Sequence, residues 1–116
     1  MRIIRLSEVN GQPWRSLACG VAMPREATSG IIYIFYDRVE TAFGRTNGTT
    51  PLELILGITM AHEIGHLLLP PGHSLKGIMR ARLDTEDWKL AEVGRLAFCR
   101  QEAERIMNAL DGDHRP

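Results

Sequence analysis

The segment from residue 50 to residue 72 constrains the fold most, because it combines a helix start, a long apolar run and an abrupt stop. Residues 54–61 are apolar at nearly every position, which is typical of a helix that is buried on several sides. Its start is predicted at Thr50 as N-cap, with Pro51 at the first helical position and Glu53 completing a capping box. Pro70 ends it, since the residue before a proline is biased away from helical geometry.

Two histidines near the end of this helix, His62 and His66, lie four residues apart. They therefore point the same way, offset by about 40° around the helix and about 6 Å along it. Two imidazoles so placed can bind one Zn²⁺ at about 2.0–2.1 Å each. Glu63 follows the first histidine, so it faces such a metal without binding it and can accept a proton from water. This HExxH pattern is a signature of zinc metalloproteases.

Chance is a poor explanation of the pattern, because the chain has four histidines and three of them, His62, His66 and His73, fall within one short window. These three histidines, followed by Met79, resemble the metzincin clan, whose longer motif is HExxHxxGxxH with a downstream methionine turn. Two departures stand out: Leu69 occupies the clan's glycine position, and His73 comes one residue late. The nearby Gly72 is expected to absorb the extra residue.

The stretch 54–82 also resembles small bacterial metzincin-like proteins. The resemblance implies that His62, His66 and His73 hold one zinc ion, that Glu63 is the general base and that the substrate is a peptide or protein. Met79 would then form an apolar floor beneath the imidazoles without binding the metal, although a plain core methionine fills gaps in the same way.

The third ligand has an alternative in Glu86, because gluzincins take a glutamate from a second helix. Asp84, Glu86 and Asp87 are better explained as the N-cap and the acidic first turn of a helix that begins near Thr85. Arg80 and Arg82 could meet substrate carboxylates but are expected in solvent, as is His114 in the polar tail. No second electrophile beside the metal is evident, because Tyr33 or Tyr36 could supply one but core packing is the expected role of both.

Strands come first and helices follow, which predicts an α+β domain. The resemblance refines this to a small zincin-like domain, with a twisted sheet packed on the buried active-site helix and with C-terminal helices. We expect one domain over residues 1–116 and no backing helix before residue 50, where residues 41–50 read as a loop. The strands are predicted at 2–6, 16–23 and 31–36, and the later helices at 85–96 and 100–110.

Composition narrows the class of partner. The chain has 116 residues, enough for one modest core. Its formal net charge is zero, which disfavours nucleic acid or an anionic membrane as the main partner. No apolar run reaches the roughly 20 residues of a membrane span. No signal peptide is visible, so a cytoplasmic chain and a mature secreted chain both fit. Cys19 and Cys99 either pair or remain buried thiols.

The sequence thus favours a zinc metalloendopeptidase that hydrolyses peptide bonds with Glu63 as general base. A catalytically silent zinc-binding regulatory or scaffold domain is the alternative, and a non-peptidase hydrolase with the same site is another. The glutamate after the first histidine argues for turnover, since a pure binding site needs no base there. Substrate specificity and oligomeric state stay open.

Overall fold

The structure, a computed structural model, describes residues 2–4, 20–24 and 30–112. Within these residues the strands β1 (Arg2–Ile4), β2 (Gly20–Pro24) and β3 (Gly30–Phe35) come first, and the helices α1 (Tyr36–Arg45), α2 (Leu52–Leu68), α3 (Thr85–Glu92) and α4 (Arg100–Gly112) follow. This order agrees with the predicted α+β class. None of these helices is long and apolar enough to cross a membrane.

Strand β3 lies at the centre of the described sheet. Strand β1 pairs with it in parallel, with Ile3 opposite Ile34, and β2 pairs antiparallel on the other side. The neighbouring side chains of Ile34 and Phe35 point to opposite faces and are both fully buried. Both faces of β3 are therefore covered, as expected for a strand that is apolar throughout. Strand β2 overlaps the predicted strand at 16–23 from Gly20 onward, and residues 16–19 lie outside the described residues.

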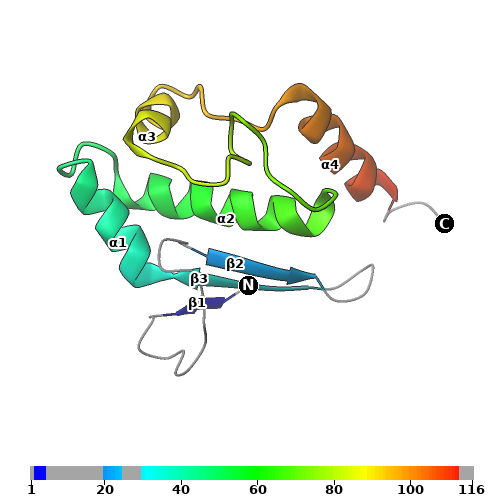
Figure 1. Cartoon of the computed structure of the whole chain (residues 1–116), viewed down its shortest axis with the longest axis horizontal. Helices are drawn as coiled ribbons and strands as arrows, with labels where there is room; N and C mark the ends of the chain where they lie inside the picture. The colour runs from blue at the N-terminus through cyan, green and yellow to red at the C-terminus, as the bar shows by residue number, and fades with distance from the viewer. Residues whose placement is uncertain (1, 5–19, 25–29, 113–116) are drawn as a thin grey trace.

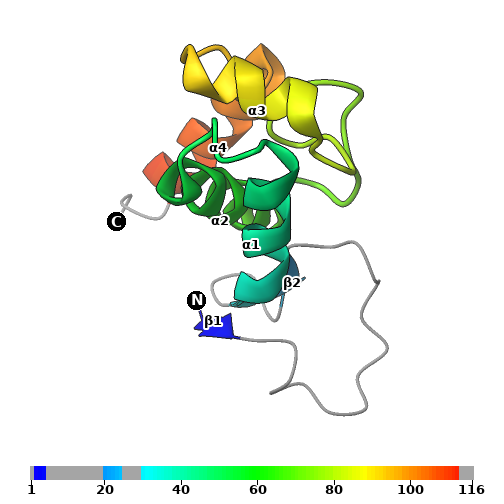
Figure 2. The same ribbon diagram turned by 90° about the vertical axis from the view of Figure 1, so that its left-hand side faces the viewer.

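Helix α2 forms the middle layer of the molecule. The sheet lies on one side of it, and α3, α4 and the segment between α2 and α3 lie on the other (Figures 1 and 2). Ile55 is fully buried in a core cluster with residues from β3, α1 and α3: Ile32, Ile34, Val39, Ala42 and Trp88. A second cluster is made of Ile78, Met79, Ala91 and Leu96. The prediction of a central buried helix therefore holds.

Helix α1 corrects the prediction that no helix precedes residue 50 and that residues 41–50 form a loop. It reaches Arg45 and packs against α2. Val39 and Ala42 form its buried stripe at helical spacing, with Phe43 partly buried beside them. Gly44 weakened the helical pattern at the sequence level. The chain turns immediately after α1, where Asn47 and Gly48 both have positive φ.

The start of α2 also differs from the prediction. The helix begins at Leu52 with Pro51 at the N-cap, and no side chain caps it. Thr50 is fully buried, and its hydroxyl donates to Glu92 Oε1 of α3 at 2.5 Å. The hydroxyl is therefore engaged by α3, so the predicted capping box does not form. The predicted end is confirmed, since Leu69 is already extended.

The C-terminal helices lie where they were predicted, with shifted ends. Helix α3 stops at Glu92, earlier than the predicted residue 96, because Gly94 adopts φ +72°. The amide of Gly94 donates to the Ala91 carbonyl and that of Arg95 to the Leu90 carbonyl, which together form a Schellman motif. On α4, the apolar side chains of Met107 and Leu110 are exposed.

Candidate metal centre

Three histidines converge near the C-terminal end of α2. His62 and His66 come from the last two turns of α2, and His73 comes from the segment that follows the helix. One ring nitrogen from each lies within 4.8 Å of the others. The ring centroids are 4.8 Å apart for His62 and His66 and 4.7 Å apart for His66 and His73. The structure thus brings the three predicted ligands close enough to hold one metal ion.

The hydrogen bonds of His62 show which of its nitrogens faces the cluster. Its Nδ1 lies 2.6 Å from the Ile78 carbonyl oxygen, an acceptor, so Nδ1 carries the proton and donates. Its Nε2 therefore carries the lone pair, and it lies 3.1 Å from His66 Nε2. Two nitrogens that bind one ion tetrahedrally at about 2.0–2.1 Å lie roughly 3.3 Å apart. The donor set and its spacing therefore fit a shared metal ion.

Burial favours the neutral imidazoles of His62 and His66. Burial, together with the neighbouring His62 and His73, lowers the pKa of His66 to about 4. Burial also lowers the pKa of His62, against the opposing effect of its hydrogen bond to the Ile78 carbonyl. Neutral imidazole is the form that binds metals, because its second nitrogen keeps a free lone pair. His66 is therefore in its ligating form at neutral pH.

Glu63 places a carboxylate beside the cluster. Its side chain is buried, and Oε2 lies 3.9 Å from His62 Nε2. Burial raises the pKa of Glu63 to about 7, because water that would stabilise the charged form is excluded. The carboxylate is thus next to the ligand atoms without being one of the three clustered donors.

Met79 packs against the turn of helix α2 that lies between His62 and His66. It is 1% exposed and belongs to the cluster with Ile78. A Cβ added to Gly65 would lie 2.5 Å from the Met79 sulfur. The glycine in this turn therefore allows the methionine to approach the helix backbone closely.

The segment that carries His73 is a tight turn. The Ser74 amide donates to the Met79 carbonyl at 2.8 Å, and the Ile78 amide donates to the Ala97 carbonyl at 2.9 Å. Gly77 has φ +85°, and a Cβ there would lie 2.5 Å from the Ala97 oxygen. This turn therefore fixes the Ile78 carbonyl that orients His62.

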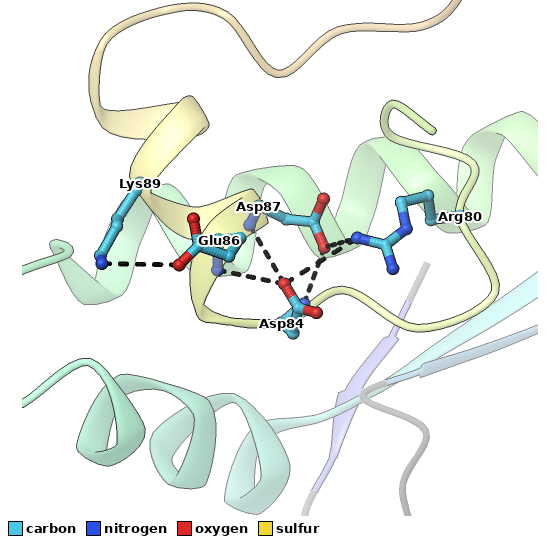
Figure 3. Close-up of polar contacts among 5 residues, drawn as sticks. All are labelled: Arg80, Asp84, Glu86, Asp87 and Lys89. Carbon is cyan, nitrogen blue, oxygen red and sulfur yellow. Dashed lines mark hydrogen bonds and ion pairs between the residues drawn. The ribbon is translucent and has the colours of Figure 1, made fainter. Parts of the chain in front are cut away.

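Arg80 joins this turn to the start of α3, which corrects the expectation that it is solvated (Figure 3). Its Nη1 lies 2.7 Å from Oδ2 of Asp87, a residue that is 3% exposed. The same oxygen accepts from the Asp84 amide at 2.8 Å, and Asp84 in turn caps α3. The predicted capping role of Asp84 and Asp87 is confirmed. Glu86 instead lies on the exposed side of α3, 3.6 Å from Lys89, and does not belong to the histidine cluster.

Other predicted residues lie apart from the cluster. Arg82 is exposed, as expected, and Tyr33 and Tyr36 are half-buried. Cys99 is an exposed free thiol, so it is not the buried residue that the sequence suggested. His114 and Cys19 lie outside the described residues.

Sequence reasoning missed the side chains that anchor the turn. Ser74 donates its hydroxyl hydrogen bond to Glu102 of α4, whose other oxygen accepts from the Cys99 amide at 3.1 Å. The spacing of Cys99 and Glu102 is that of an N-cap residue and the N3 glutamate, which was a usable signal for the second contact. The contact with Ser74 spans 28 residues and has no local sequence signal.

Comparison with family models, with curated proteins and with solved structures finds no match for the chain. Any conclusion about function therefore rests on the geometry of the histidine cluster and of Glu63.

Proposed function

We propose that the chain is a zinc metallopeptidase, in which His62, His66 and His73 hold one zinc ion and Glu63 is the general base. The observation that carries this proposal is a three-histidine cluster with a buried carboxylate beside it. Structural zinc sites are closed by four protein ligands, whereas catalytic sites use three and leave one position open. Among the residues that the structure describes, the cluster offers three ligands.

The chain's own residues account for the proton transfers of peptide hydrolysis. When bound, zinc would supply a Lewis acid that acidifies water and polarises the substrate carbonyl. Glu63, adjacent to His62 on α2, accepts the proton of the attacking water and delivers it to the leaving amine. His62 keeps its orientation through the Ile78 carbonyl, which holds the Nδ1 proton and directs Nε2 into the cluster.

A sheet edge would supply a binding surface for the proposed peptide or protein substrate. Strand β2 is at the edge of the described sheet, and it packs beside α2. An extended peptide added to such an edge is held mainly through its backbone. The same arrangement supports a zincin-like architecture, in which a sheet and a backing helix, here α1, pack on the active-site helix (Figure 1). Metzincin-like membership, with Met79 as the floor of the site, is part of this proposal.

Hydrolysis of a denatured protein mixture tests the function, with zinc-loaded wild type compared with Glu63→Gln. The variant should retain zinc and fold but lose roughly 10²-fold or more in rate, the usual scale for a general base. Glu53→Gln is the matched control, because Glu53 lies on the same helix and is exposed. A zinc-loaded wild type that cleaves nothing would favour the silent binding domain, and an unimpaired Glu63→Gln would exclude Glu63 as the base.

A further inference from the structure

His73 differs from the other two clustered histidines in how its backbone is held. His62 and His66 are fixed by the hydrogen bonds of α2, whereas His73 lies in the irregular segment between α2 and α3 and is exposed. When a metal ligand lies in a loop, metal binding costs conformational entropy unless neighbouring residues already hold that loop in place. Something outside α2 therefore has to position this imidazole.

The next residue, Ser74, is anchored at three points. Its amide donates to the Met79 carbonyl at 2.8 Å, and its backbone forms an isolated bridge with Arg80. Its hydroxyl donates to Glu102 Oε2. The two backbone contacts lie within the turn itself, so the hydroxyl is the contact by which Ser74 reaches a separate helix.

Glu102 is suited to this anchoring role. Its carboxylate is shared, with Oε1 accepting from the Cys99 amide at 3.1 Å and Oε2 from the Ser74 hydroxyl. Burial alone would raise the pKa of Glu102, but the hydrogen bonds from Ser74 and Cys99 outweigh it and lower the pKa. Glu102 is thus a charged acceptor that is held by donors from two segments, the turn and the start of α4.

We propose that Glu102 is a positioning residue for His73, acting through the Ser74 hydroxyl. This inference rests on the zinc site proposed above. The carboxylate holds Ser74, and Ser74 holds the backbone of the preceding histidine, so the ligand is set in place before the metal arrives. Partners that orient ligands in this way typically change metal affinity by about 10–100-fold.

Zinc affinity, measured by competition with a chromophoric chelator in the full chain, tests the proposal without any substrate. Ser74→Ala should weaken zinc binding by about 10–100-fold. This variant leaves the contact between Glu102 and the Cys99 amide intact, so α4 keeps its cap. Ser74→Thr, which retains the hydroxyl, should bind zinc nearly as tightly as wild type. A role confined to fold stability would instead lower the unfolding temperature of the metal-free protein and leave affinity unchanged.

A double-mutant cycle identifies the partner. Glu102→Ala should weaken binding to a similar extent, and adding Ser74→Ala to it should cost little more, because both changes remove one interaction. Glu104→Ala is the matched control on α4, since Glu104 is exposed and forms an ion pair with Arg100 of the same helix. Cobalt substitution adds a spectroscopic readout: Ser74→Ala should alter the visible absorption of the bound ion, and Glu104→Ala should not.

The outcomes separate this inference from the proposed function. If wild type binds zinc and Ser74→Ala binds it equally tightly, the positioning role is wrong and the peptidase proposal stands. If the two single changes are additive, Glu102 does not act through Ser74. If wild type binds no zinc, the proposed function fails, and this inference fails with it.

Discussion

The sulfur of Met79 packs against the backbone of α2 at Gly65, so closely that a Cβ atom there would lie 2.5 Å from it. Gly65 immediately precedes His66, and Met79 immediately follows Ile78, whose carbonyl orients His62. This one contact between α2 and the turn therefore links the backbone beside His66 to the carbonyl that orients His62. Its tightness makes the site sensitive to small changes in volume at this point.

Gly65→Ala should destabilise the fold and disturb the site, because the new methyl group meets Met79 and also lies 3.1 Å from Phe98. We expect the free energy of unfolding to fall by about 1–3 kcal/mol, the usual cost of overpacking. Gly57→Ala is the control on the same helix, since nothing lies within 4 Å of its added Cβ. It should instead stabilise by about 0.5–1 kcal/mol through helix propensity. Denaturant unfolding of both variants checks this, and equal effects would refute the close contact.

Asp87→Ala should destabilise the turn that carries Met79. It removes the acceptor of both the Arg80 guanidinium and the Asp84 amide. Leaving such donors without a partner costs about 1–3 kcal/mol of unfolding free energy, at the lower end here because Arg80 is partly exposed. Glu86→Ala, next to it and facing solvent, should cost less than about 1 kcal/mol. Thermal unfolding compares the two, and a similar small cost for both would contradict the anchoring role of Asp87.

Acid titration should reveal the charge of Asp84. Burial alone would raise its pKa, but hydrogen bonds from Asp87 and Glu86 and the charge of Arg80 lower it below 3.8. A carboxyl with a lowered folded-state pKa stabilises the fold above its unfolded pKa and loses that contribution as pH falls through the folded pKa. Asp84→Asn keeps an N-cap acceptor but cannot ionise. The stability advantage of wild type over Asp84→Asn should therefore shrink below about pH 4, and an advantage that is constant with pH would rule out this linkage.

His73→Ala should weaken zinc binding severely, whereas Glu86→Ala should leave affinity nearly unchanged. The structure places His73 with the two helical histidines and Glu86 beside Lys89. Two histidines make a poor zinc site, since structural and catalytic sites use three or four protein ligands. Zinc titration of the two variants checks this, and the reverse order of effects would favour the gluzincin arrangement.

The sequence was most informative where local chemistry decides structure. The spacing of His62 and His66, the apolar run before them and the proline after Leu69 are all local signals, and the buried helix lies where they predicted it. The capping role of Asp84 is likewise local, and the structure agrees.

The errors arose where contacts distant in sequence override local preference. Threonine is a residue type favoured at N-caps, but the Thr50 hydroxyl donates to Glu92 of α3 instead. An arginine in a loop is expected to be solvated, but α3 places the buried carboxylate of Asp87 beside Arg80. Helix α1 was missed because Gly44 weakens its helix propensity. Packing of its short buried stripe against the rest of the molecule is enough to stabilise the helix.

Metal analysis of the purified chain tests the central claim most directly. Protein prepared without chelator should contain close to one zinc ion per chain, and His66→Ala should release it, because ligand loss removes most of the binding free energy. Zinc at that stoichiometry, lost on the single substitution, is the result that the three-histidine centre predicts. Wild-type protein that is folded, free of metal and unable to take up added zinc would contradict it.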